Sequence, residues 1–165
     1  MPNFFGSTML PVPLDLAELT TLVREISADE GFWRPHLRLP ESDARWWTLL
    51  WTDPDVDVWL LSWLPGQATE LHDHGDSAAA FAVLSGQLTE SRIEAGRLRV
   101  HPRPARTTTW VAPGVVHDVH GAGQSPAASI HAYSPPLRRM HYYDAAGVHV
   151  LRSVATTESE EPLER

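Results

Sequence analysis

A series of short apolar or alternating segments fills the chain after Gly31 and constrains its fold more than any other feature. Each segment has the length and residue types of a β-strand, and Pro, Gly and Asp residues typical of turns separate it from the next. The segments read WWTLLW, VDVWLLSWL, AAAFAVL, QLTESRI, RLRVH, TTTWVA, VVHDVH, AASIHAY, MHYYD and VHVLR. Their close spacing predicts an all-β domain, either a small antiparallel barrel or a jelly roll.

One helix is expected before this region. Apolar residues recur every three or four positions between residues 14 and 28, and Asp15 is a suitable N-terminal cap. The acidic C-terminal tail has no apolar pattern, so we expect it to be disordered. The predicted organisation is a helical segment over residues 1–30, a β-domain over residues 31–154 and a tail over residues 155–165.

Composition excludes several classes of function. The chain has no cysteine, and its 13 basic residues are all arginine, which excludes disulfides, zinc–thiolate sites, cysteine nucleophiles and Schiff-base lysines. A net charge of -8 would repel nucleic acids and anionic membranes. No secretion signal is evident, and no segment approaches the roughly 18 apolar residues of a membrane span. We therefore expect a soluble cytoplasmic protein without nucleic-acid or membrane partners; the oligomeric state stays open.

Two histidines, His72 and His74, lie one residue apart directly before an uncharged apolar run. On a strand such residues share one face, so their imidazoles would project together while Asp73 faces away. A third histidine, His117, follows a tight turn and could lie on an adjacent strand. The pair alone could also be ordinary polar surface residues. As a trio the histidines would form a metal-binding face, and imidazole suits zinc, copper, nickel and iron alike.

The residues around the pair resemble a known pattern. The spacing G(X)5HXH(X)4E(X)6G of the first cupin motif is reproduced by Gly66, His72, His74, Ala79 and Gly86, with alanine in the glutamate slot. Downstream, the Pro-Gly pair before His117 is similar to the second cupin motif, although no residue separates the proline from the glycine. This resemblance implies a cupin jelly-roll β-barrel with one metal ion inside. Without the glutamate, the metal would keep its full divalent charge and favour an anionic ligand such as a thiolate.

A second polar row lies near the C-terminus. Ser129, His131 and Tyr133 alternate along one predicted strand and therefore share a face. Two prolines end this strand at once. The residues alone allow either a hydrogen-bonded row beside a site or a Tyr–His pair satisfied within the barrel wall.

Together, the HDH stretch, the distant His117 and the SIHAYSPP segment resemble the cysteine dioxygenase family of thiol dioxygenases, which are cupins. The resemblance covers roughly residues 43–144. It implies that both atoms of O2 are added to a small thiol, cysteine or a relative, to give a sulfinate. It also implies a ferrous ion held by His72, His74 and His117, with Ser129, His131 and Tyr133 as catalytic residues around it.

Two positions depart from the family. Animal members carry a cysteine crosslinked to the tyrosine, and the spacing places that cysteine at or beside Ala79, so this chain resembles the bacterial members without a crosslink. The arginine that binds the substrate carboxylate in cysteine-specific members would fall within residues 46–50, where no residue is basic. Two other arginines are candidates for binding the substrate carboxylate: Arg45, just before these residues, and Arg138, after the prolines.

Two other functions remain open on the sequence. The first is another metal-dependent cupin enzyme, an isomerase or a dioxygenase acting on carbon; a glutamate at position 79 would favour it, whereas the Ser129, His131 and Tyr133 row does not. The second is a non-enzymatic metal- or small-molecule-binding cupin. An accompanying DNA-binding domain would favour a regulatory protein of that kind, and a single helix is too little for one.

Overall fold

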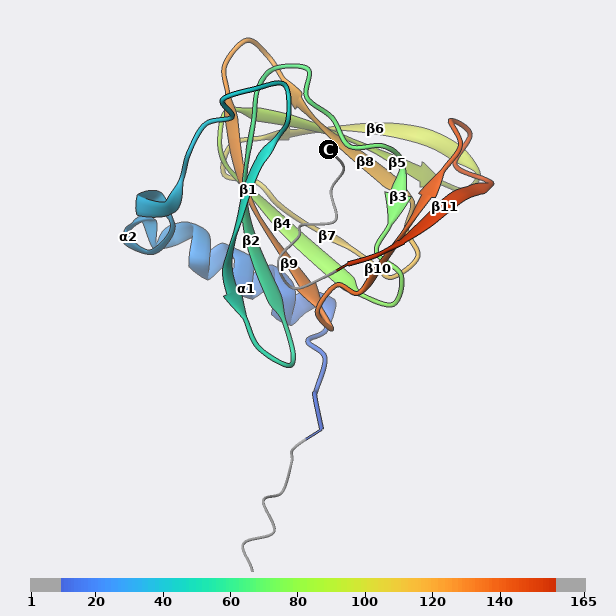
Figure 1. Ribbon diagram of the computed structural model, residues 1–165, viewed down its shortest axis with the longest axis horizontal. Coiled ribbons are helices and arrows are strands. Elements are labelled where there is room, and N and C mark those ends of the chain that lie inside the picture. Colours follow the sequence, from blue (N-terminus) through green and yellow to red (C-terminus); the bar gives the residue numbers. More distant parts are fainter. Residues whose placement is uncertain (1–9, 157–165) are drawn as a thin grey trace, which may run out of the picture.

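The computed structural model describes residues 10–156 and consists of two antiparallel β-sheets with helices at the N-terminal side (Figure 1). The helices are α1 (Leu16–Ala28), α2 (Glu30–Trp33) and the short 3-10 helix η1 (Arg34–His36). The strands are β1 (Trp46–Thr52), β2 (Asp57–Trp63), β3 (His72–Asp73), β4 (Ala78–Ser85), β5 (Gln87–Glu94), β6 (Arg97–Pro104), β7 (Thr108–Val111), β8 (His117–Ala122), β9 (Ala127–Ser134), β10 (Arg139–Tyr143) and β11 (Val150–Ala155). Each of the ten segments predicted from the sequence overlaps one of these strands.

The first sheet has the strand order β1-β2-β9-β4-β7, and the second has the order β11-β10-β3-β8-β5-β6. Neighbouring strands are antiparallel throughout the paired segments. The sheets face each other around a shared interior (Figure 1). No strand pairing joins the two sheets within residues 10–156. The all-β prediction is therefore confirmed, and the observed form is a jelly roll of two facing sheets rather than a closed barrel.

The first sheet is buried on both faces. Its inner face carries aromatic side chains such as Trp59 and Phe81, which belong to the core between the sheets. Its outer face carries small residues such as Ala80 and Ala132, which pack against Leu19 of α1. Because both faces are covered, β2, β4 and β9 are continuous apolar or buried runs instead of alternating ones.

The N-terminal helix begins and ends close to its predicted bounds. Asp15 accepts a hydrogen bond from the backbone N–H of Glu18, and the Glu18 side chain accepts one from the Asp15 backbone, which forms a capping box. The helical region then continues through α2 and η1 to His36, beyond the predicted boundary at residue 30. No helix in the described part of the chain is long and apolar enough to cross a membrane.

The segment that carries the paired histidines is framed by two glycines with left-handed backbones. Gly66 has a φ of 84° and donates its backbone N–H to the Gly121 carbonyl at 3.0 Å. Gly86 has a φ of 69°, and a Cβ atom there would lie 2.5 Å from the Pro126 carbonyl oxygen. Both turns thus require glycine, for a structural reason that the cupin spacing alone does not reveal.

The two-residue strand β3 positions the candidate site. It lies between β10 and β8 in the second sheet, and its His72 is directly opposite His117 on β8. The edge strand β11, beyond β10 in the same sheet, ends at Ala155. From residue 157 onward, the tail predicted to be disordered lies outside the described residues.

Candidate metal centre

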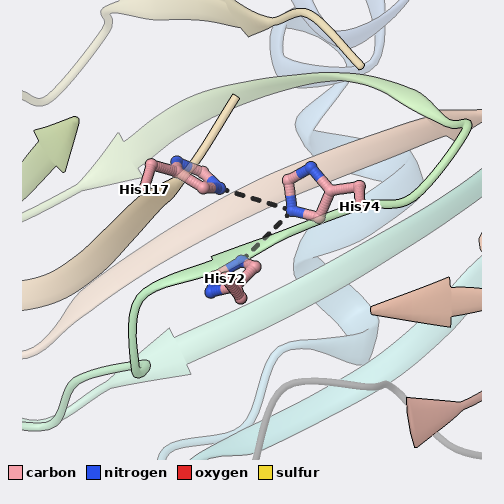
Figure 2. Close-up of side chains that lie close together, drawn as sticks. All are labelled: His72, His74 and His117. Carbon is pink, nitrogen blue, oxygen red and sulfur yellow. Dashed lines mark hydrogen bonds between the residues drawn. The ribbon is translucent and has the colours of Figure 1, made fainter. Parts of the chain in front are cut away.

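Three histidine side chains meet in the interior between the sheets (Figure 2). His72 lies on β3, His74 follows it by two residues, and His117 begins β8. All three are buried, with exposed fractions of 3% or less. The Nε2 atom of His74 lies 3.2 Å from Nε2 of His72 and 3.3 Å from Nε2 of His117. The structure therefore brings together the three residues predicted as metal ligands.

The spacing of these nitrogen atoms fits a single metal ion. A metal–nitrogen bond of about 2.1 Å places two ligand nitrogens about 3.0 Å apart at a right angle and about 3.4 Å apart at a tetrahedral angle. The two measured separations lie between these values, and the three ligand atoms lie within 4.8 Å of one another. The donor set is therefore suited in both distance and chemistry to a divalent transition metal.

The other ring nitrogens of two histidines are fixed by hydrogen bonds. His72 donates from Nδ1 to the backbone carbonyl oxygen of Glu70 at 2.7 Å. His117 Nδ1 lies 2.8 Å from the Glu90 carboxylate and donates to it. A neutral imidazole carries one proton, so these bonds leave a lone pair on each Nε2. His74 packs differently, with its ring centroid 5.0 Å from that of Tyr133 in an edge-to-face arrangement.

Burial keeps the three imidazoles neutral at ordinary pH. It lowers the pKa of His72 to about 4, while the Glu70 carbonyl opposes this shift. Burial also lowers the pKa of His74 and of His117 well below the usual histidine value, and nearby imidazoles and arginines add to the effect. Neutral imidazoles are the form that binds metal, so the site needs no deprotonation before a metal enters.

The residue beside His117 was not predicted from the sequence. Glu90 lies on β5 with 0% exposure, and its carboxylate also accepts hydrogen bonds from Arg92 and Arg103. Strand alternation places Glu90 in phase with the buried Leu88, which was the available signal. That signal was weak because a glutamate within a polar segment usually faces solvent.

The polar row of β9 lies on the inner face of the first sheet. The indole Nε1 of Trp63 donates to Ser129 Oγ at 2.9 Å, and Ser129 Oγ lies 2.8 Å from His131 Nε2. The His131 ring stacks on Phe81 with a centroid separation of 5.0 Å. Burial and, to a smaller extent, the positive charge of Arg45 lower the pKa of His131 to about 3.

Tyr133 connects this row to the histidine cluster. Its side chain is 1% exposed, and its ring contacts that of His74. On the neighbouring strand β4, Ala79 is directly opposite Tyr133. The position where a crosslinking cysteine was expected therefore lies beside the tyrosine, and it holds an alanine.

The two candidate carboxylate ligands lie in different surroundings. The Arg45 guanidinium lies over the Trp63 ring, 5.0 Å from its centroid, and its charge lowers the pKa of His72 as well as that of His131. Both pKa effects indicate that the Arg45 charge lies near the histidine cluster. The Arg138 side chain is 59% exposed and lies 3.9 Å from Asp57. It lines a pocket that His74 also lines, so the structure leaves both arginines as candidates.

The two-sheet fold and the three-histidine cluster define a cupin with a candidate metal centre. Solved structures share the fold at low identity. The protein TT1209 from Thermus thermophilus is 19% identical with a TM-score of 0.56, over 62% of this chain and 93% of its own. A Klebsiella pneumoniae protein with a double-stranded β-helix domain is 20% identical with a TM-score of 0.54, over 62% and 85%. The cysteine dioxygenase type I family matches residues 12–146, and the chain belongs to that family.

Proposed function

We propose that this protein is an iron-dependent thiol dioxygenase that adds both atoms of O2 to the sulfur of a small carboxylate-bearing thiol. The reaction converts a thiolate and O2 into a sulfinate, so atoms and charge balance without another reductant. The convergence of three neutral histidine nitrogens supports this proposal most directly. Membership of the cysteine dioxygenase type I family supports the choice of reaction.

His72, His74 and His117 would hold the iron on one face and leave its other positions open. When bound, ferrous ion would supply a site where thiolate and O2 meet, together with the redox chemistry that lets them react. Imidazole ligands do not select iron on their own, so the choice of iron rests on the family. With no carboxylate ligand among the three, the site favours an anionic substrate atom.

Arg45 would bind the substrate carboxylate. Its guanidinium is held over Trp63 and presents a fixed set of donors that matches a carboxylate. Its charge lowers the pKa of both His72 and His131, which supports a position near the proposed reaction centre. Arg138 is the less suitable candidate because its side chain is exposed and lies near Asp57.

Ser129 and His131 would orient groups rather than transfer protons. The Trp63 N–H occupies a lone pair of Ser129, which leaves the hydroxyl proton free for His131 Nε2. His131 would then carry its own proton on Nδ1. A pKa of about 3 makes His131 a poor general base near neutral pH. Tyr133, which contacts His74, would donate a hydrogen bond to the substrate during oxygen transfer.

Anaerobic loading of the full chain with ferrous ion, followed by measurement of O2 uptake and sulfinate formation, tests this function. The substrates would be cysteine, 3-mercaptopropionate, cysteamine and a bulkier thiol. We expect turnover of the carboxylate thiols and little turnover of cysteamine. Iron-loaded protein that consumes no O2 with any thiol would refute the proposal and favour a metal-binding cupin without this activity.

A further inference from the structure

The most completely buried charge in the described structure is on β5. Glu90 has 0% exposure, and a buried carboxylate is costly unless it is fully paired. Three donors surround it: His117 Nδ1 at 2.8 Å, Arg92 Nε at 2.7 Å and Arg103 Nε at 2.8 Å. The pairing explains how the charge is tolerated but not why a charge is placed there.

The two carboxylate oxygens have different partners. Oε1 accepts from both His117 and Arg92, whereas Oε2 accepts from Arg103. Arg92 is itself fixed, since its guanidinium also donates to the Trp110 carbonyl. The orientation of Oε1 toward His117 is thus set by groups on three strands, β5, β6 and β7.

We propose that Glu90 is a positioning residue for the metal centre and that it acts through His117. By accepting the Nδ1 proton, it fixes the tautomer in which Nε2 presents a lone pair to the other two histidines. An ionised acceptor also makes the imidazole a stronger donor than a neutral carbonyl does. His72 Nδ1 donates instead to the neutral Glu70 carbonyl, so His117 is the more strongly binding ligand of the two. This inference rests on the proposed metal site and not on the thiol reaction.

A purely structural role would be different. In that case Glu90 would only pair with Arg92 and Arg103, and its charge would matter whether or not His117 bound a metal. The two roles separate when Arg103 is replaced as well, because the double variant E90Q/R103Q restores the formal charge of the cluster. It does not restore the carboxylate at His117.

The test measures the affinity of the metal-free full chain for Co2+, together with the visible spectrum of the bound ion. For E90Q we expect binding weaker by roughly 10- to 100-fold, with a shifted spectrum. E90Q/R103Q should remain impaired, whereas R103Q alone should lose less affinity than E90Q, because Arg92 still holds Oε1. Glu94→Gln is the matched control, because Glu94 lies on the same strand and pairs with His101 at an exposed position.

Wild-type affinity in E90Q, or recovery of that affinity in E90Q/R103Q, would overturn the proposal. If the E90Q variant does not fold, E90D is used in its place. Aspartate keeps the charge, but its shorter side chain reaches less far toward His117, so weaker Co2+ binding is expected. Normal Co2+ binding by E90D would contradict the proposal. Co2+ affinity does not depend on thiol turnover. A failure of the dioxygenase function would therefore appear as normal metal binding without O2 uptake, which is distinguishable from a failure here.

Discussion

Replacing Arg45 by glutamine removes the charge proposed to bind the substrate carboxylate while keeping a side chain of similar reach. A hydrogen bond to a charged group contributes about 1.5 to 3 kcal/mol. That loss corresponds to a decrease in kcat/KM of roughly 10- to 150-fold. The upper part of this range applies if the pair is shielded from water, and the Arg45 Nη1 atom is buried in the structure.

The assay compares 3-mercaptopropionate with its methyl ester, which has nearly the same shape but no charge. With R45Q, kcat/KM for the acid should fall by the amount above, whereas the value for the ester should change by less than about threefold. R138Q is the matched control. Arg138 pairs with Asp57 and lines the same pocket as His74, so R138Q tests the alternative carboxylate-binding residue. If Arg45 binds the carboxylate, R138Q should affect neither substrate.

Comparison with the ester also distinguishes loss of carboxylate binding from an indirect effect of R45Q on the site. Arg45 lies over Trp63, whose indole donates to Ser129, so its removal could disturb the orientation of His131. Such a disturbance would slow the acid and the ester equally. Equal losses for both substrates would refute the role of Arg45 in substrate binding, as would an R45Q variant with unchanged preference for the acid.

Three further outcomes are expected. Y133F should slow thiol oxidation while leaving iron content unchanged, and loss of iron in Y133F would show that Tyr133 is misplaced in our proposal. Burial holds the pKa of His72 at about 4 and that of His131 at about 3, so below about pH 6.5 the unfolded chain binds more protons than the folded chain. In urea titrations of the metal-free protein, the free energy of unfolding should therefore be greatest above that pH and fall progressively toward pH 4. A flat profile would contradict these pKa shifts. Gly86→Ala should lower the free energy of unfolding by about 1 to 3 kcal/mol, because position 86 combines a left-handed φ with a close approach to Pro126. An unchanged melting temperature would contradict that explanation.

Strand positions could be predicted from the sequence because apolar runs and turn residues are local signals. The paired histidines were recognisable for the same reason, since alternation along a few residues places His72 and His74 together. Their pairing with His117 needed more than local pattern. It depends on β3 lying between β8 and β10, and a strand of only two residues leaves little periodicity to detect.

The rest of the site depends on contacts between distant segments. Glu90 becomes a partner of His117 only because β5 pairs with β8. The Arg45 guanidinium lies over Trp63, a residue of β2, and strand alternation alone left the direction of its side chain open. In both cases the side chain that matters is charged and lies on an otherwise polar stretch, where sequence statistics favour exposure.

The two sheets carry different parts of the proposed site. The second sheet carries the paired ligands His72 and His117 and the buried Glu90, whereas the first sheet carries the Ser129, His131 and Tyr133 row, with Arg45 directly before its first strand. The groups on each sheet are fixed mainly by partners on the same sheet: Glu90 by Arg92 and Arg103, and Ser129 by Trp63. Substitutions in the first sheet should therefore alter turnover and substrate preference at constant metal content, while substitutions around Glu90 should alter metal affinity first. A variant of Ser129 that lost metal, or a variant of Glu90 that kept full affinity but lost thiol selectivity, would show that the sheets do not act separately.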